Sequence, residues 1–222
     1  TNNVLEDPRD RVCDPPLTAL GWEQARRLAY HLATGSRLGT SDGAHSGGYG
    51  ITRLYCSPMW RALQTTWPVA EALGLAPEVW VALHEHGGIY LDHGDEKGIV
   101  GYPGKTRQEI LEEFPGYVLP DEITDHGWWT GGWEELAACY ARAVKVADRL
   151  REWAGRDERI ALISHGTFID ALLKALLNQL PGYHLWYSHF NTGITRIDFL
   201  EDGRLRVRYL NRIEHLPPDL IS

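Results

Sequence analysis

The sequence predicts a three-layer α/β domain with a mostly parallel sheet and helices on both faces. Two short apolar runs, at residues 51–56 and 160–163, have the length and composition of buried parallel strands. Each run is followed by a segment with the periodicity of an amphipathic helix, and this alternation implies parallel pairing with right-handed crossovers. The 222 residues, 43% of them hydrophobic, suffice for a single domain over residues 1–222 with a substantial core.

The first half of the chain is predicted to form one helix before and one helix after the strand at 51–56. Thr18 is expected to cap the first helix, and the stretch 35–50, rich in Gly, Ser and His, is a surface loop. The second helix should end at Gly74. Helical spacing predicts their buried positions, which are Ala25, Leu28, Ala29 and Leu32 in the first helix and Ala62, Thr66, Val69, Ala70 and Leu73 in the second.

Regular periodicity fades between about residues 82 and 132, apart from a predicted helix at 106–114 that stops before Pro115-Gly116. A long helix then leads to the strand at 160–163. Its expected apolar positions are Leu136, Tyr140, Val144 and Ala147. The remaining predicted elements are a helix at 168–177 and an antiparallel hairpin at the sheet edge, formed by 195–200 and 205–210.

Charge, cysteine content and hydropathy exclude several classes of protein. A formal net charge of −8 argues against nucleic acid or an anionic membrane surface as a partner, since both would repel the chain. The chain has three widely spaced cysteines, Cys13, Cys56 and Cys139. Their odd number and spacing argue against a disulfide framework and favour a protein of the reducing cytoplasm. No apolar run is long enough for a transmembrane helix.

His165 is the first catalytic candidate. It follows the apolar run 160–163 and Ser164, and it precedes Gly166 and an amphipathic segment. Open α/β sheets bind their ligands at the carboxyl ends of the strands, where this histidine is predicted to lie. A histidine after a strand also has a purely structural interpretation, so further residues are needed to support a functional one.

Arg61 is the second candidate, because it follows the other predicted strand. Ser57 is a natural N-cap and Pro58 a natural first helical residue, which places Arg61 in the first turn of a helix directed at the same sheet edge. An arginine beside free helix N–H groups is suited to binding an anion. Taken alone, a solvated cation on a helix is the simpler interpretation of Arg61.

Five ordered segments together resemble the histidine phosphatase superfamily, also called phosphoglycerate mutase-like, over most of the chain. They are Pro16-Leu17-Thr18-Ala19-Leu20-Gly21 with Gln24-Ala25, Ser57-Pro58 with Arg61-Ala62-Leu63-Gln64-Thr65, Leu83-His84-Glu85, Gly132-Trp133-Glu134 with Arg142, and Ser164-His165-Gly166. The family more often has Glu-Ser where this chain has Glu134-Glu135. The resemblance implies that residues 82–132 form a cap inserted over the active site.

One family element has no counterpart in the sequence, namely the first strand, which ends in Arg-His-Gly and carries the histidine that becomes phosphorylated. Thr1-Asn2-Asn3 is similar to the end of that motif, with Asn3 at the family's phosphate-pocket asparagine. Three explanations remain open: an N-terminal piece is missing from the sequence, the piece has been cut away, or the protein is a pseudoenzyme. We expect the nucleophile just upstream of Thr1, because loss of a central parallel strand should unfold the domain.

The resemblance assigns roles to the candidates. Arg61 and His165 would hold the transferred phosphoryl group, with further donors from Asn3 and from the N–H groups of Gly166 and Thr167. Glu85 would be the general acid for the leaving group and, on dephosphorylation, the base that activates water. The scheme needs no cofactor and no metal.

A rival interpretation concerns the imidazole and carboxylate groups between residues 84 and 96, which could form a metal site. They are His84, Glu85, His86, Asp92, His93, Asp95 and Glu96. Gly87-Gly88 interrupts any pair of helical ligands among them, so the spacing is unfavourable for such a site.

The function predicted from the sequence is a phosphomonoester phosphatase that acts through a phosphohistidine on a small phosphorylated metabolite. A phosphoglycerate mutase is the alternative, although the run His86-Gly87-Gly88-Ile89-Tyr90 differs from the run that follows the acid in glycolytic mutases. An inactive family member that binds a phosphorylated ligand or a protein is the alternative from another class.

Overall fold

The computed structural model describes residues 11–35, 48–94, 96–182 and 184–222. Its centre is a parallel sheet of three strands in the order β2-β1-β5, and their bounds are Glu78–Val79 for β2, Arg53–Cys56 for β1 and Ile160–Ile163 for β5. Cys56 pairs with Val79 on one side and with Ile163 on the other, so the three strands end at one edge. The predicted parallel α/β architecture is confirmed.

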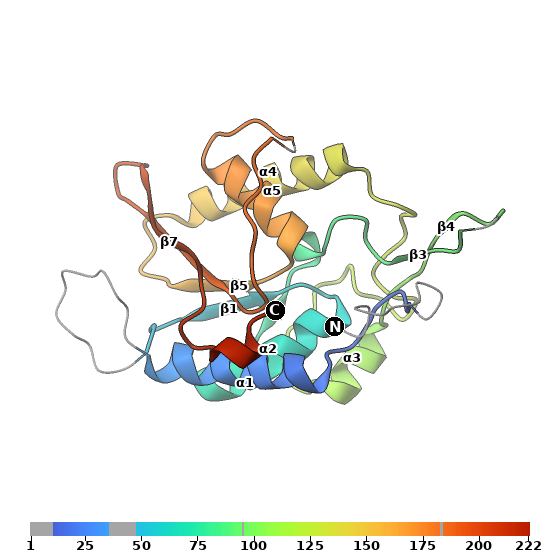
Figure 1. Cartoon of the computed structure of the whole chain (residues 1–222), viewed down its shortest axis with the longest axis horizontal. Helices are drawn as coiled ribbons and strands as arrows, with labels where there is room; N and C mark the ends of the chain where they lie inside the picture. Colours follow the sequence, from blue (N-terminus) through green and yellow to red (C-terminus); the bar gives the residue numbers. More distant parts are fainter. Residues whose placement is uncertain (1–10, 36–47, 95, 183) are drawn as a thin grey trace.

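Helices cover both faces of this sheet. In Figure 1, α1 (Ala19–Thr34) and α2 (Trp60–Leu73) lie below β1 and β5, and α4 (Leu136–Trp153) and α5 (Gly166–Leu176) lie above them. Successive β1 side chains serve the two faces, because Leu54 packs in the cluster of α1 and α2 whereas Tyr55 packs against α4 and α5. The result is the predicted three-layer arrangement.

The capping of α1 is as predicted, and the start of α2 is not. The Thr18 hydroxyl accepts the Gly21 N–H at 3.1 Å, and the four predicted positions of α1 are buried. However, α2 begins at Trp60, so the prediction that Ser57 caps it and that Pro58 is its first residue is wrong by two positions. The cap comes from outside the local sequence, because the Asp14 carboxylate accepts the Trp60 N–H at 3.0 and 3.1 Å.

The buried face of α4 also differs from the prediction. Val144 is 48% exposed, although it was expected on the apolar face. Small side chains form much of the interface with α5 instead, since a closely packed pair of helices accommodates Ala and Cys better than larger residues. The buried positions are Cys139, Ala143, Val146, Ala147 and Leu150.

The segment without clear periodicity contains short elements. A 3-10 turn, η2 (Val81–Leu83), is followed by a hairpin of β3 (Tyr90–Asp92) and β4 (Ile99–Gly101) and then by α3 (Arg107–Glu113). Helix α3 has the predicted position and begins with a capping box between Thr106 and Glu109. The hairpin was not predicted, because three-residue strands are too short to show an alternating pattern.

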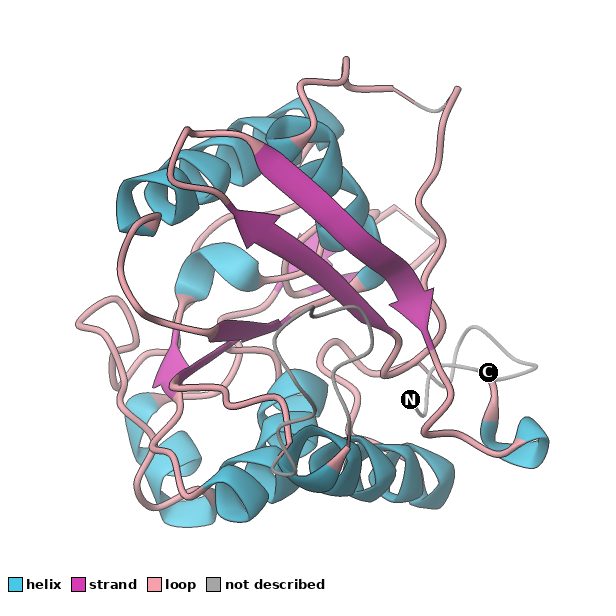
Figure 2. Cartoon of the chain, turned by 90° about the vertical axis from the view of Figure 1, so that its left-hand side faces the viewer, coloured by secondary structure: helices cyan, strands magenta, loops and turns pink. Residues whose placement is uncertain are grey.

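The C-terminal hairpin is confirmed, with β6 at Ile194–Phe199 and β7 at Leu205–Arg212. It forms a two-stranded sheet of its own, separate from the parallel sheet (Figure 2). Among the described residues β5 therefore pairs only with β1, and all four of its residues are half-buried. The chain closes with a 3-10 turn, η3 (Pro218–Leu220).

Several predicted features lie partly or wholly outside the described residues, among them Asn3, the loop at 35–50 and the candidate metal ligand Asp95. Most of the loop predicted at 35–50 lies outside them, since the structure omits 36–47. Within the parts of the chain that are described, no helix is long and apolar enough to cross a lipid bilayer.

Candidate active site

The carboxyl ends of β1 and β5 bring Ser57 and His165 together. The Ser57 N–H donates to the Ile163 carbonyl at 3.0 Å, which continues the pairing of the two strands by one step. The His165 ring then reaches the Ser57 hydroxyl, with 2.7 Å between Nε2 and Oγ. Both residues are buried at the carboxyl ends of the strands, where α/β proteins bind ligands.

His165 is neutral in this environment. Burial lowers the pKa of its imidazole well below the ordinary value, and electrostatic interactions with Arg61, His84 and Arg142 lower it further. The ring therefore contributes a neutral N–H donor in this state of the molecule rather than a cation. A bound phosphoryl anion would oppose both effects and favour the protonated ring.

Arg61 lies in the first turn of α2 and faces the same region. Removal from water lowers its pKa, whereas the nearby charges of Asp14 and Glu85 oppose that shift. Arginine nevertheless stays protonated at any physiological pH. No ion pair to Arg61 is found within the described ranges, so its cationic charge is balanced only through space by these two carboxylates.

Asp14 is a site residue that sequence reasoning missed. Its carboxylate caps α2 at Trp60, and burial raises its pKa to about 6 despite the opposing charge of Arg61. Nothing in the local sequence signals this role, because Asp14 and Trp60 are 46 residues apart and meet only in the folded chain. Ser57 was also missed as a partner of His165, although its position directly after a strand is the same signal that identified His165.

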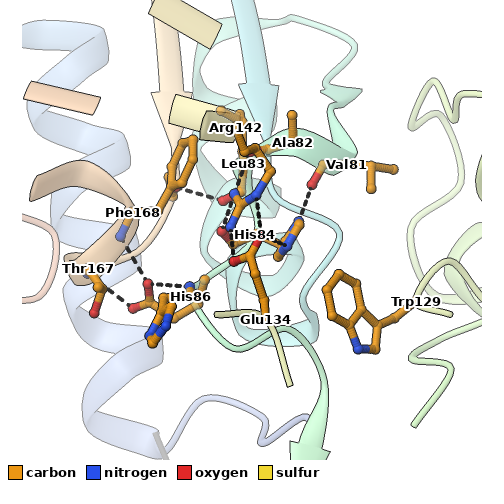
Figure 3. Close-up of polar contacts among 12 residues, drawn as sticks. Val81, Ala82, Leu83, His84, His86, Trp129, Glu134, Arg142, Thr167 and Phe168 are labelled. Carbon is orange, nitrogen blue, oxygen red and sulfur yellow. Dashed lines mark hydrogen bonds and ion pairs between the residues drawn. The ribbon is translucent and has the colours of Figure 1, made fainter. Parts of the chain in front are cut away.

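The Glu85 carboxylate accepts three backbone N–H groups. Oε1 accepts those of His86 at 2.9 Å and Phe168 at 3.0 Å, and Oε2 accepts that of Thr167 at 3.3 Å (Figure 3). Two of these donors belong to the first turn of α5, where negative charge is stabilised by unpaired N–H groups. Glu85 thus occupies the helix start that begins with Gly166, and it uses the Thr167 donor that was predicted to bind substrate.

A second buried group of charges lies behind Glu85. Arg142 of α4 makes a bidentate pair with Glu134, with 2.9 Å between Nε and Oε1 and 2.6 Å between its terminal nitrogen and Oε2. Burial alone would raise the pKa of Glu134, but hydrogen bonds from His84 and Arg142 outweigh it and lower the pKa to about 2. The His84 ring contacts the rings of Trp128 and Trp129 in tilted arrangements, at centroid distances of 5.5 and 4.9 Å.

The structure therefore brings together most of the residues predicted from the sequence. Arg61, Glu85, His165, Gly166 and Thr167 come from α2, the segment after η2 and the junction of β5 with α5. The predicted phosphate ligand Asn3 lies outside the described residues. Within the described ranges, no three His, Cys, Asp or Glu side chains are grouped so as to hold a metal ion.

Comparison with known proteins agrees with this geometry. The sequence matches the Histidine phosphatase superfamily (branch 1) over residues 2–212. The chain belongs to this superfamily. Members of the superfamily are usually phosphatases or mutases. No curated protein is significantly similar to the chain.

Solved structures share the superfamily fold at low sequence identity. A phosphoserine phosphatase mutant from Entamoeba histolytica in complex with phosphoserine is 21% identical, with a TM-score of 0.54 over 93% of this chain and 90% of that one. The same phosphatase in complex with 3-phosphoglyceric acid is 21% identical, with a TM-score of 0.51 over 92% and 88%. A mycobacterial glucosyl-3-phosphoglycerate phosphatase in complex with VO3 is 24% identical, with a TM-score of 0.53 over 90% and 88%.

Proposed function

We propose that this protein is a phosphomonoester phosphatase that acts through a phosphohistidine intermediate on a small phosphorylated metabolite. The observation that carries the proposal is the convergence of Arg61, His165 and Glu85 at one edge of the parallel sheet. A fixed cation and an imidazole there face the first turn of α5, which also favours anions. These are the groups that stabilise a transferring phosphoryl group.

Each side chain then has a defined task. Arg61 holds the equatorial oxygens of the phosphoryl group, and His165 donates an N–H from its ring while Ser57 fixes the ring through the bond to Nε2. Glu85 protonates the leaving alkoxide and later removes a proton from the attacking water. The Glu85 carboxylate lies within electrostatic reach of Arg61, so acid and anion site are adjacent.

The nucleophilic histidine remains part of the proposal. We place it on a strand that pairs with the outer edge of β5. Two observations support this position: β5 is apolar yet half-buried, and within the described residues its outer edge pairs with no strand. A parallel strand added there would end beside His165.

The class of substrate follows from the site and from the superfamily. Phosphoserine and 3-phosphoglyceric acid are named with the solved relatives, which supports a small phosphorylated compound as ligand. The solved relatives described above are named as phosphatases, which supports transfer of the phosphoryl group to water. A cytoplasmic location fits the three free cysteines, two of them buried.

Replacing Arg61 with Ala in the full-length gene product tests the proposal. We expect turnover of p-nitrophenyl phosphate to fall by at least about a hundredfold, because a fixed charge on the transferring group is lost. Circular dichroism and thermal melting would confirm that the variant is folded. Unchanged turnover in a folded Arg61→Ala protein would refute the site, and phosphate binding without turnover in the wild type would favour the inactive alternative.

A further inference from the structure

The bidentate pair of Arg142 and Glu134 has more contacts than an ion pair requires. The side chains of both residues are nearly buried, at 12% and 8% exposure. The remaining terminal nitrogen of Arg142 donates to two backbone carbonyls, those of Ala82 at 2.7 Å and His84 at 2.8 Å. The guanidinium therefore connects α4 to the peptide units directly before Glu85.

Two further hydrogen bonds hold the backbone on either side of Glu85. The Glu134 N–H donates to the Gly87 carbonyl at 3.2 Å, and the Ser164 hydroxyl donates to the Leu83 carbonyl at 2.7 Å. The segment from Ala82 to Gly87 is thus fixed at four carbonyls by groups from α4, its preceding loop and the end of β5. Such a segment cannot shift without breaking several buried hydrogen bonds.

A second route leads from Arg142 to the carboxylate itself. The guanidinium carbon lies 4.4 Å from the ring centroid of Phe168, which is completely buried. The N–H of Phe168 is one of the donors to Glu85 Oε1. Figure 3 shows both routes, with Arg142 between the backbone of residues 82–84 and the Phe168 ring. One cation therefore contacts both the backbone that carries Glu85 and a residue that binds its carboxylate.

We propose that Glu134 and Arg142 are positioning residues for Glu85 in the phosphatase reaction. The inference rests on the proposed function, in which Glu85 must deliver a proton to the leaving oxygen. Proton transfer tolerates errors of only a fraction of an ångström, and the flexible side chain of a glutamate does not hold that position unaided. Arg142 and Glu134 hydrogen-bond to backbone carbonyls on both sides of Glu85 and not to its carboxylate, so they act through Glu85 and not on substrate.

The test compares two substrates that differ in their need for a general acid. Alkyl phosphates such as glycerol phosphate require a proton on the leaving oxygen, whereas p-nitrophenyl phosphate does not. In the full-length protein, Glu134→Gln should lower kcat about tenfold on the alkyl phosphate and less than threefold on the aryl phosphate. Glu85→Gln should show the same selectivity with a larger loss. The double variant Glu85→Gln/Glu134→Gln should be no slower than Glu85→Gln alone.

The controls separate positioning from a general loss of structure. Arg149→Gln removes an exposed ion pair with Glu152 on the same helix and should leave both rates within twofold. Thermal melting accompanies each variant, and Glu134→Gln carries the test if Arg142→Lys does not fold. Equal slowing of the two substrates, or additive losses in the double variant, would overturn the positioning role while the phosphatase assignment stood. A folded wild type that turns over neither substrate would overturn both.

Discussion

Two buried ion pairs in this protein have similar chemistry and different surroundings. Arg142 and Glu134 pair between α4 and the loop before it, and Lys174 and Asp170 pair one turn apart within α5 at 2.7 Å. In both pairs the cation also donates to backbone carbonyls, and Lys174 reaches that of Gly182 at 2.7 Å. The first pair holds the segment that carries Glu85. The second holds the chain after α5, where the Tyr187 N–H donates to Asp170.

The difference shows that burial of an ion pair does not by itself identify a functional residue. Removing one partner from either pair should cost stability, because a charge is left buried and unpaired. Only the pair that holds the backbone around Glu85, the proposed general acid, should also change the chemistry. The two pairs differ in the backbone groups that the cation contacts. Substitutions in either pair should therefore lower stability, but only those in the Arg142–Glu134 pair should also change activity.

Of the stability effects predicted for the two pairs, the largest should follow from removing Lys174 from α5. Lys174→Met leaves Asp170 buried without a cation, and we expect the free energy of unfolding to fall by about 3 to 5 kcal/mol. Urea denaturation measures this change. The ratio of alkyl to aryl phosphate turnover, taken per folded molecule, should stay unchanged.

The double variant Lys174→Met/Asp170→Leu is the matched control for this prediction. It should recover most of the lost stability, because an apolar pair can replace a buried ion pair of similar volume. A shift of the substrate ratio in Lys174→Met like that of Glu134→Gln would show that the two pairs do not differ in the way described.

At low pH we expect a smaller loss of folding stability that is specific to the pair of Arg142 and Glu134. The pKa of Glu134 is lowered to about 2 in the folded protein from an ordinary 4.5, so its stabilisation is complete above about pH 5 and is lost as the pH falls toward 2. Between pH 6 and pH 3 the wild type should lose about 2 kcal/mol more than Glu134→Gln. Denaturant midpoints across that range would measure it.

The stabilisation from Lys174 should be lost at high pH rather than at low pH. Burial alone would lower its pKa, but hydrogen bonds to Asp170 and to the Tyr140 hydroxyl outweigh it and raise the pKa. Its contribution is therefore present in neutral solution and lost only in strong alkali.

Glu152→Gln, which alters an exposed ion pair on α4, is the control for the acid experiment on Glu134. Identical acid profiles for the wild type and Glu134→Gln would contradict the assignment of charge to Glu134.

The sequence predicted those candidate residues that lie at the end of a strand or the start of a helix. His165 and Arg61 were found because each follows an apolar run, and the parallel register of β1 and β5 then places them near one another. Glu85 was found by the order of motifs. These signals are local, so they survive without knowledge of tertiary contacts.

Other features needed the folded chain. Asp14 replaces the expected cap of α2 from 46 residues away, and Val144 is exposed because small residues form the contact between α4 and α5. The role of Arg142 depends on carbonyls about 60 residues earlier, at Ala82 and His84. A carbonyl has no side-chain signature, so no pattern in the sequence points to such a contact.

The central claim is that the site at the end of β1 and β5 supports transfer of a phosphoryl group through an enzyme histidine. Rapid mixing of the full-length gene product with a phosphomonoester, followed by intact mass measurement at neutral pH, tests it most directly. The account predicts a mass gain of one phosphoryl group that is lost in acid and is absent from Arg61→Ala at the same reaction time. Hydrolysis of the phosphomonoester by the wild type without any phosphorylated protein would contradict the account.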